Sequence, residues 1–358
     1  MRGAQSTRGA ILESVRRGRA TTRRDLTELT GASRSAVAQA VADLVAEGLL
    51  TEYEGEREAR RGRPSTRLRA GGGHGLVVAI DLGHEHLAVA VRGLDHQLAS
   101  ERRQPFPVDD DPDAAVLEAD RLLGSLLAEH GARRANIRAV GIAVPFPVLP
   151  QEGRVADLRG RSTRDRARPW DLLAVPAGAA LVLDNNANLG AWGEQLHEVD
   201  PAVRTLVYVR AGSGLGTGLV VDGAIFGGYR SGVGEVGHVV VPGCTVVCRC
   251  GRVGCLDGLV REASRPSASP ADVVAAGRAV GVATAQLAAF VAPDAVVLGG
   301  PLGVGSEVFA SMARRAFDES APPELGGLVR APRAGVRAEL WGALDRATQE
   351  AWSHVSSW

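Results

Sequence analysis

The chain has 358 residues, with 41 arginines as its basic side chains, 41 Asp and Glu, and a formal net charge of zero. This length predicts two or three domains with a hydrophobic core. No apolar run of membrane-spanning length is evident, and the start lacks the apolar centre of a signal peptide, so we expect a cytoplasmic protein without a membrane partner. Residues 1–70 hold 14 Arg against 9 Asp and Glu, a net charge of +5 that leaves −5 for the rest. A basic head on an acidic body predicts that the head binds a polyanion.

The basic head begins with the pattern of two short helices. Three apolar residues make one side of the first helix: Ile11, Leu12 and Val15. Thr22-Arg-Arg-Asp25 has the form of a capping box, which predicts the start of a second helix. That helix should run through Leu26 and Leu29 and end at Gly31, because glycine readily closes a helix.

A third helix is expected from a cap at Ser33 to about Glu47, with Gly48 closing it. Its buried stripe consists of apolar residues at helical spacing: Val37, Val41, Leu44 and Val45. The N-terminal end of such a helix reaches base edges in the major groove, where Gln pairs with adenine and Arg with guanine. We therefore predict DNA contacts from four residues near this end: Ser33, Arg34, Ser35 and Gln39.

A basic hairpin is predicted directly after the third helix. Apolar positions at 49–53 precede an arginine-rich run at 57–69. A solvated linker is the alternative interpretation, but the position after a helix-turn-helix favours a wing that reaches phosphates or the minor groove. We expect Arg61 and Arg63 to contact DNA there. For the whole head, a helical interaction module is the alternative to DNA binding, and the glycines at 71–73 predict a hinge after it.

From residue 76 onward, short β runs alternate with helical stretches, which predicts a layered α/β body. The expected strands are 76–80, 87–91, 139–144, 181–183, 206–209, 219–221 and 295–298. The expected helices are 112–130, 189–197, 270–290 and 303–317. Glycine-rich turns at 211–218 and 299–301 offer backbone amides for phosphate, although tight turns after strands need glycine in any case.

All four cysteines lie within twelve positions, in the run Cys244-Thr-Val-Val-Cys248-Arg-Cys250-Gly-Arg-Val-Gly-Cys255. His238 stands just upstream, and zinc readily takes such a set of nitrogen and sulfur ligands. Disulfides and unrelated buried thiols are the alternatives, but Cys248 and Cys250 are separated by a single residue. Five candidates compete for four positions, so the spacing alone leaves the ligand set open.

Together these motifs resemble the ROK family of repressors, uncharacterised reading frames and sugar kinases, across essentially the whole chain. The motifs are Asp184-Asn-Asn-Ala-Asn188 with Gly193-Glu194, Gly212-Ser-Gly-Leu-Gly-Thr-Gly218, Gly234-Glu-Val-Gly-His238, Cys248-Arg-Cys-Gly-Arg-Val-Gly-Cys-Leu-Asp257 and Val297-Leu-Gly-Gly300. The resemblance implies an actin/hexokinase-like (ribonuclease H-like) α/β body of two lobes that enclose a sugar cleft. An N-terminal winged helix-turn-helix is found in the family's transcription factors and is absent from its stand-alone kinases.

We accordingly expect a winged helix-turn-helix domain at 1–70, an N-terminal lobe at 71–183 and a C-terminal lobe at 184–358, whose last helix packs back on the N-terminal lobe. The resemblance implies one structural Zn²⁺ ion and leaves Cys244 outside its site. The implied zinc ligands are His238, Cys248, Cys250 and Cys255. The residues implied to bind a sugar effector are Asn185, Asn186, Glu235, His238 and Asp257.

Two departures from the kinase pattern argue against an enzyme. The first phosphate loop of the family's kinases reads Asp-x-Gly-Gly-Thr, but this chain has Asp81-Leu-Gly-His-Glu85, whose histidine and carboxylate would crowd and repel phosphates. The kinases' general base is an aspartate at the position of Asn186, and a carboxamide cannot take up the substrate proton. We therefore expect no phosphoryl transfer.

The sugar cleft departs from the family pattern as well. Phe146 replaces a glycine of the family's Val-Pro-Gly-Pro-Val, and Asp257 is shorter than the usual glutamate. Either an apolar plug in a degenerate cleft or a changed effector specificity would result.

The sequence thus predicts a DNA-binding transcriptional regulator, a repressor of carbohydrate-utilisation genes with a sugar or sugar-derived effector. It would act as a homodimer or homotetramer on an inverted-repeat operator in double-stranded DNA. Two alternatives are a sugar kinase with an appended DNA-binding head, and a ligand-independent DNA-binding oligomer with a degenerate sugar cleft.

Overall fold

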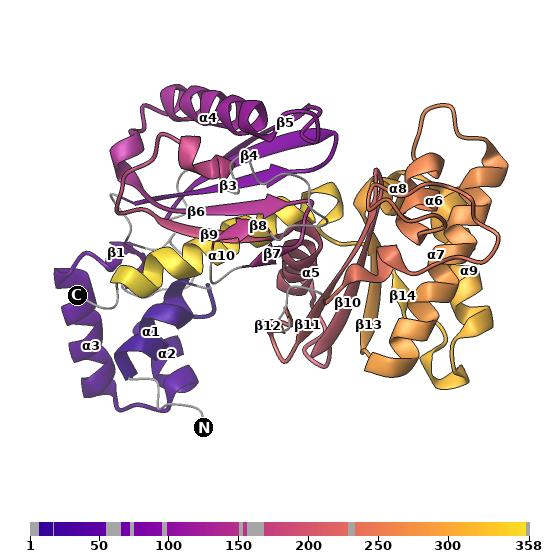
Figure 1. Cartoon of the computed structure of the whole chain (residues 1–358). Helices are drawn as coiled ribbons and strands as arrows, with labels where there is room; N and C mark the ends of the chain where they lie inside the picture. Colours follow the sequence, from indigo (N-terminus) through magenta and orange to yellow (C-terminus); the bar gives the residue numbers. More distant parts are fainter. Residues whose placement is uncertain are drawn as a thin grey trace.

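The computed structural model describes residues 7–16, 18–54, 66–71, 75–94, 99–149, 153–155, 168–227 and 233–355. It has a helical head at the lower left of Figure 1, a first α/β lobe above it and a second α/β lobe at the right. The last helix, α10 (Ala338–Val355), starts at the junction of the two lobes, runs beneath the first lobe and ends beside the head (Figure 1).

The head consists of three helices and a two-stranded antiparallel hairpin. They are α1 (Thr7–Arg16), α2 (Arg23–Thr30), α3 (Arg34–Ala46), β1 (Leu50–Glu54) and β2 (Thr66–Ala70). The predicted capping box at the start of α2 is confirmed, because Thr22 and Asp25 exchange side-chain and backbone hydrogen bonds. Gly31 ends this helix in the left-handed region, with φ of 66°.

The predicted start and buried stripe of α3 are also confirmed. Its N-cap is Ser33, whose hydroxyl accepts the backbone N–H of Ala36 at 3.2 Å. Val37, Val41 and Leu44 of its apolar stripe are buried, and Val45 is partly buried against the same core. Leu29 of α2 is 55% exposed, since this eight-residue helix buries Leu26 alone.

The first lobe is built on a five-stranded sheet in the order β5-β4-β3-β6-β9. Its strands are β3 (Leu76–Leu82), β4 (His86–Gly93), β5 (Ala99–Pro105), β6 (Ile137–Val144) and β9 (Ala180–Asn185). β3 is antiparallel to β4 and parallel to β6. Because successive side chains of a strand point to opposite faces, Val78 and Ile80 pack with α4 (Pro112–Glu129), while Val77 and Ala79 pack with α10.

The second lobe is built on a sheet in the order β12-β11-β10-β13-β14. Its strands are β10 (Thr205–Ala211), β11 (Leu215–Val221), β12 (Ala224–Ile225), β13 (Ala295–Gly299) and β14 (Val329–Arg330). Helices α6 (Leu256–Ala263), α7 (Pro270–Val291) and α9 (Glu307–Ser320) share a core with one face of it. On the other face, α5 (Asn186–His197) packs against β10 and β11.

Short elements complete the described part of the chain: η1 (Arg134–Asn136), β7 (Val148–Leu149), β8 (Arg154–Val155), η3 (Pro169–Leu172), η4 (Glu235–His238), α8 (Gly300–Gly305), η5 (Pro323–Leu325) and η6 (Gly335–Arg337). The glycine-rich run at 211–218 is only partly a turn, since β11 already starts at Leu215. Its last glycine serves packing, because a β-carbon on Gly218 would lie 2.1 Å from the carbonyl oxygen of Ala187.

Among the described helices, α7 alone has the length and composition of a membrane span, with a mean hydropathy of 1.5. The sequence predicts a helix at 270–290 and no membrane span there. Residues making up 44% of its most apolar window are buried, and α7 packs against α6 and α9. Core helices of globular domains share these properties, so the finding is weak evidence for a membrane.

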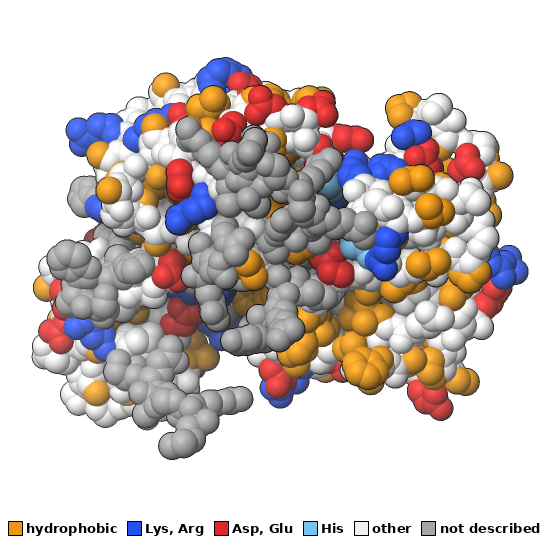
Figure 2. All heavy atoms as spheres, in the orientation of Figure 1, with side chains coloured by type: hydrophobic (Ala, Val, Ile, Leu, Met, Phe, Trp, Pro, Cys, Tyr) orange, Lys and Arg blue, Asp and Glu red, His pale blue; other side chains and the backbone are white. Residues whose placement is uncertain are grey.

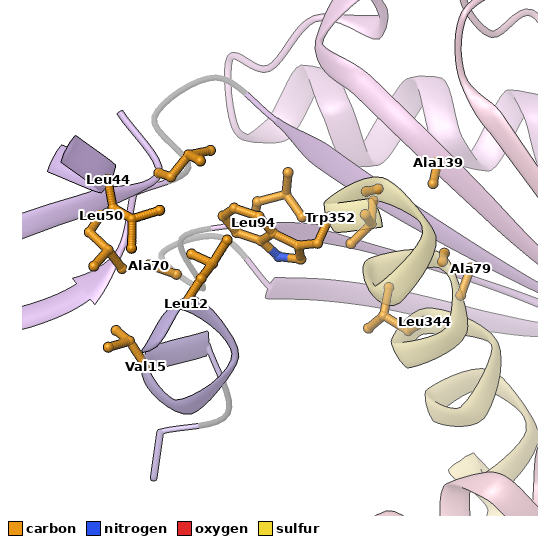
Figure 3. Close-up of a cluster of buried hydrophobic side chains, with 14 of the residues drawn as sticks. Leu12, Val15, Leu44, Leu50, Ala70, Ala79, Leu94, Ala139, Leu344 and Trp352 are labelled. Carbon is orange, nitrogen blue, oxygen red and sulfur yellow. The ribbon is translucent and has the colours of Figure 1, made fainter. Parts of the chain in front are cut away.

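Helix α10 joins the two lobes and the head. It lies so close to α5 that a β-carbon on Gly342 would lie 1.9 Å from the carbonyl oxygen of Leu189. Further along, its apolar face belongs to one continuous cluster with the underside of the first sheet and the core of the head. Figure 3 shows Trp352 of α10 beside Leu94 of the lobe and Leu12 of the head.

Candidate metal centre and inter-lobe site

Four side chains on the loop between η4 and α6 converge on one point. The Nδ1 or Nε2 of His238 and the sulfurs of Cys248, Cys250 and Cys255 all lie within 4.8 Å of one another. The Cys250 and Cys255 sulfurs are 3.5 Å apart, and the Cys248 sulfur is 3.6 Å from His238 Nδ1. A tetrahedral zinc ion with Zn–S bonds of about 2.3 Å separates its sulfurs by roughly 3.8 Å, so the cluster fits a metal.

The loop holds its thiols through backbone turns. Gly251 and Gly254 adopt φ of 79° and 86°, the left-handed conformation that lets the backbone turn tightly around the site. Burial opposes ionisation of Cys250, but hydrogen bonds from Arg252 and the neighbouring cysteines lower the pKa of Cys250 to about 7. Burial raises the pKa of Cys248 in the metal-free loop. Cys244 is not a member of the four-residue cluster, and none of the four cysteines forms a disulfide.

The same loop brings three of the predicted effector residues together. His238 turns Nδ1 toward Cys248, while its Nε2 lies 3.5 Å from Glu235 Oε2. Asp257 Oδ2 accepts a hydrogen bond from the Cys248 thiol at 3.4 Å, and its Oδ1 accepts the Leu215 N–H at 2.9 Å. Burial and the neighbouring carboxylate of Asp257 raise the pKa of Glu235.

The other two predicted effector residues lie at the start of α5. Asn185 is the N-cap: its Oδ1 accepts the Ala187 N–H at 2.8 Å, and its Nδ2 donates to the carbonyl oxygen of Phe146 at 3.0 Å. Asn186 is buried. In the part of the chain that the structure describes, no hydrogen bond joins Asn185 to Glu235 or Asp257. The five residues therefore form two groups, on α5 and on the metal loop.

Asp184, two residues before Asn186, is engaged in hydrogen bonds at the start of α5. Asp184 Oδ1 accepts hydrogen bonds from the Asn185 backbone N–H at 2.7 Å and from Asn188 Nδ2 at 2.9 Å. Burial raises the pKa of Asp184. The carboxylate is thus tied to the start of its own helix.

The turn from Asp81 to His86 is closed over its own aspartate. Asp81 is fully buried, and its Oδ2 lies 2.8 Å from His86 Nε2. The His86 ring covers Gly83, where a β-carbon would come within 2.0 Å of it. Burial by itself would raise the pKa of Asp81, but His86, Arg210 and Arg103 hold it below its usual value. Sequence reasoning missed His86, and it placed a repelling carboxylate at Glu85, which is exposed to solvent.

The predicted DNA-reading face of α3 is open. Arg34, Ser35 and Gln39 are exposed, and Gln39 donates a hydrogen bond to Asp43 at 2.9 Å. Ser33 is engaged as the helix cap. Figure 1 shows α3 at the outer edge of the head. Arg61 and Arg63 lie outside the described residues.

The ROK family model matches residues 77–268, more than half of the chain. The chain therefore belongs to the ROK family. It is similar to the xylose repressor of Caldicellulosiruptor bescii, with 26% identity over 260 residues, 70% of this chain and 63% of the relative. It is also similar to the N-acetylmannosamine kinase of Salmonella newport (strain SL254), with 29% identity over 198 residues, 55% of this chain and 65% of the kinase. The matches span less than two thirds of either relative.

Solved structures share the fold. A ROK family transcriptional regulator, described as a homolog of the E. coli MLC protein, superposes with a TM-score of 0.71 at 18% identity, over 99% of both chains. A ROK family glucokinase from Streptomyces griseus, solved with glucose and AMPPNP, superposes with a TM-score of 0.60 at 23% identity, over 77% of this chain and 100% of the kinase. At these identities the likeness establishes the fold, including the two-lobe body.

Proposed function

We propose that this protein is a DNA-binding transcriptional regulator, a repressor of carbohydrate-utilisation genes that responds to a sugar or sugar-derived effector between its lobes. The observation that carries the proposal is the helix-turn-helix with an open α3 face, joined to a ROK body. The regulator structure matches 99% of this chain, whereas the glucokinase matches 77%. The xylose repressor relatives also support the proposal.

We further propose the absence of kinase activity, although kinases are among the relatives. The amide of Asn186 offers no base, and Asp81 is buried under His86. The Asp81 carboxylate cannot orient a nucleotide's phosphates or their metal ion unless the imidazole of His86 is displaced. The two features lie on different lobes, so a single change would not restore the reaction.

The metal loop fits a structural role for Zn²⁺, held by His238, Cys248, Cys250 and Cys255. When bound, the ion would be a tetrahedral cross-link that orders this loop. The loop in turn holds Glu235 beside His238 and Asp257 beside Cys248. We propose that His238 would ligate the ion through Nδ1, which lies 3.6 Å from the Cys248 sulfur, while Nε2 faces Glu235.

We propose the division into a DNA-binding domain at 1–70 and lobes at 71–183 and 184–358, with α10 as the connection between them. The first turn of α5 carries Asn185 and Asn186, and two turns later Trp192 donates from Nε1 to Asp345 of α10 at 2.9 Å. The far end of α10 reaches the head's core through Trp352 (Figure 3). A ligand that moves α5 would therefore act on the head through a packed helix.

Double-stranded DNA with an inverted repeat is the proposed partner, bound by a homodimer or homotetramer in the cytoplasm. Selection of genomic DNA fragments by the purified full-length protein tests this function. We expect enrichment of a palindromic site whose affinity falls by at least about tenfold when one sugar of a panel is added. No enriched site would refute the DNA-binding function, and an enriched site that no sugar affects would favour the ligand-independent oligomer. Sugar-dependent ATP consumption in a parallel coupled assay would favour the kinase.

A further inference from the structure

Two side chains, one from each lobe, meet at the carboxylate of Asp109. Asp109 lies in the turn between β5 and α4 of the first lobe, and its Oδ1 accepts a hydrogen bond from His84 Nδ1 at 2.7 Å. Its Oδ2 lies 3.2 Å from Nε of Arg249, which belongs to the metal loop of the second lobe. Arg249 also donates from Nη1 to the carbonyl oxygen of Ser213, in the turn between β10 and β11, at 2.5 Å.

The contact is packed on its remaining sides. The side chain of His84 is only 12% exposed, and its Nε2 lies 3.4 Å from where a β-carbon on Gly214 would stand. Its ring meets that of Phe146 edge-on, with centroids 5.8 Å apart. Gly214 and Ser213 belong to the second lobe, whereas His84 and Phe146 belong to the first. Histidine and arginine side chains gather along the junction of the lobes in the face that Figure 2 shows.

The charges explain why these residues meet. A carboxylate receiving both a ring N–H and a guanidinium makes charge-assisted hydrogen bonds, which are shorter and stronger than neutral ones. Asp109 and Arg249 are 25% and 31% exposed, so water weakens the pair less than at an open surface. His84 stands where the family's kinases have the second glycine of their phosphate loop. The substitution therefore supplies an inter-lobe contact in addition to blocking phosphate.

We propose that His84, Asp109 and Arg249 form a latch that holds the two lobes closed in the absence of any nucleotide. Asp109 provides the negative charge between the lobes, and Arg249 joins it to the loop that carries Cys248 and Cys250. A ligand entering between the lobes acts on the protein by opening or reinforcing this latch. The inference concerns lobe closure and stands independently of DNA binding.

The latch is tested by small-angle X-ray scattering and hydrogen exchange on the full-length protein without DNA. The variants are Asp109→Asn, Arg249→Met and the double variant. We expect each single variant to have a larger radius of gyration than the wild type. The amides at 83–86 and 212–215 should exchange about tenfold faster or more, a factor that corresponds to about 1.4 kcal/mol. Because both substitutions remove the same contact, the double variant should open no further than either single variant.

Matched controls separate the latch from general damage. Asp110→Asn changes the exposed neighbour of Asp109, and Arg265→Met changes an arginine that pairs with Glu262 within the second lobe. Both should keep the wild-type radius of gyration. The radius of Arg249→Lys should exceed that of the wild type only slightly, because the positive charge remains. Adding NaCl to about 1 M should open the wild type and leave the double variant unchanged, since the Debye length falls to about 3 Å.

Two outcomes would overturn the proposal. One is an unchanged radius and exchange rate in both single variants. The other is additive opening in the double variant, which would show that the two residues act through separate contacts. Metal content and far-ultraviolet circular dichroism are measured on every variant. A variant that loses its fold or its metal is replaced by Arg249→Gln, for which the same opening is expected and whose unchanged radius would count against the latch.

Discussion

Cys250 illustrates how one side chain can decide the state of the metal loop. Its sulfur lies 3.5 Å from that of Cys255, and both are buried. Burial raises the pKa of the Cys248 thiol, whereas at Cys250 burial is outweighed by hydrogen bonds from Arg252 and the neighbouring cysteines, which lower the pKa of Cys250 to about 7. A divalent ion would displace the thiol protons and would be bound by four ligands. The fold of the loop and its metal content should therefore be linked.

We expect Cys250→Ser to lose most of the bound zinc and several kcal/mol of stability, because a serine hydroxyl is a poor zinc ligand. Elemental analysis by mass spectrometry measures the metal, and thermal unfolding measures the stability. Cys244→Ser is the matched control, since this thiol lies outside the cluster, and it should retain one zinc per chain. Full zinc content in Cys250→Ser would remove this residue from the ligand set.

The absence of a base at Asn186 leads to a second prediction at the residue scale. Asn186→Asp should not create sugar-dependent ATP turnover, because Asp81 stays buried under His86 and is unable to meet a phosphate-bound metal. A coupled assay across a sugar panel measures the turnover. The triple variant Asn186→Asp, His84→Gly, Glu85→Thr is the stricter test of whether sugar-dependent ATP turnover can be restored. Turnover in the unmodified protein would contradict the regulator-only function.

At the scale of elements, α3 combines a buried stripe with an exposed start. Its cap at Ser33 and its contacts through Val37 and Val41 fix how the helix leaves the head. Arg34 and Gln39 then project from the exposed side. In the free protein, a hydrogen bond to Asp43 holds the Gln39 side-chain amide in one orientation. To contact a base, Gln39 would have to exchange this bond for one with the DNA.

Arg34→Ala and Gln39→Ala should each relax discrimination between operator and random DNA by about 1–3 kcal/mol, the range for one bidentate base contact. Fluorescence anisotropy with both DNAs, at fixed salt, measures the difference. Arg315→Ala on α9 removes an equally exposed charge far from the head and should leave both affinities unchanged. An equal loss on operator and random DNA would instead assign the two residues to phosphate contacts.

At the scale of the whole molecule, α10 is the element that touches every part. Its first turn holds Glu339, which accepts from Arg210 at 2.9 Å and from the Tyr208 hydroxyl at 3.1 Å in a buried site of the second lobe. Its middle packs beneath the first sheet, where Thr348 accepts from Arg92 at 2.6 Å. Its end joins the head through Trp352. Motions of the lobes and of the head therefore share one rigid segment.

Trp352→Ala should destabilise the protein by about 3–5 kcal/mol, the usual cost of truncating a buried tryptophan. It should also weaken the effect of the sugar on operator binding while sugar affinity stays within about twofold, because the contact between head and lobe is lost. Calorimetric unfolding and titrations with and without sugar measure the two effects. Phe290→Ala, at a side chain 90% exposed, should change stability by no more than about 0.5 kcal/mol. An undiminished sugar effect in Trp352→Ala would exclude α10 as the connection.

Much of this protein follows from local sequence. The sequence predicted the helix caps at Thr22 and Ser33 and the cluster of cysteines. The interacting groups are only a few residues apart, so their spacing limits where they can lie. The buried strands of the two sheets were also predicted, since an apolar run of β-branched residues has few stable alternatives. The edge strand β5 was missed, because its residues are mostly polar and their pairing with β4 leaves no local signal.

The tertiary structure alone decided which distant residues meet. His84, Asp109 and Arg249 have no common motif, and the sequence assigned His84 only a blocking role. Likewise, the last helix was expected against the N-terminal lobe, but its contact with the head through Trp352 had no signal in the sequence. Such contacts depend on the path of the chain between them, which is set by the whole core. Local propensities act over a few residues, so they specify the elements, while long-range packing specifies how the lobes and the head are joined.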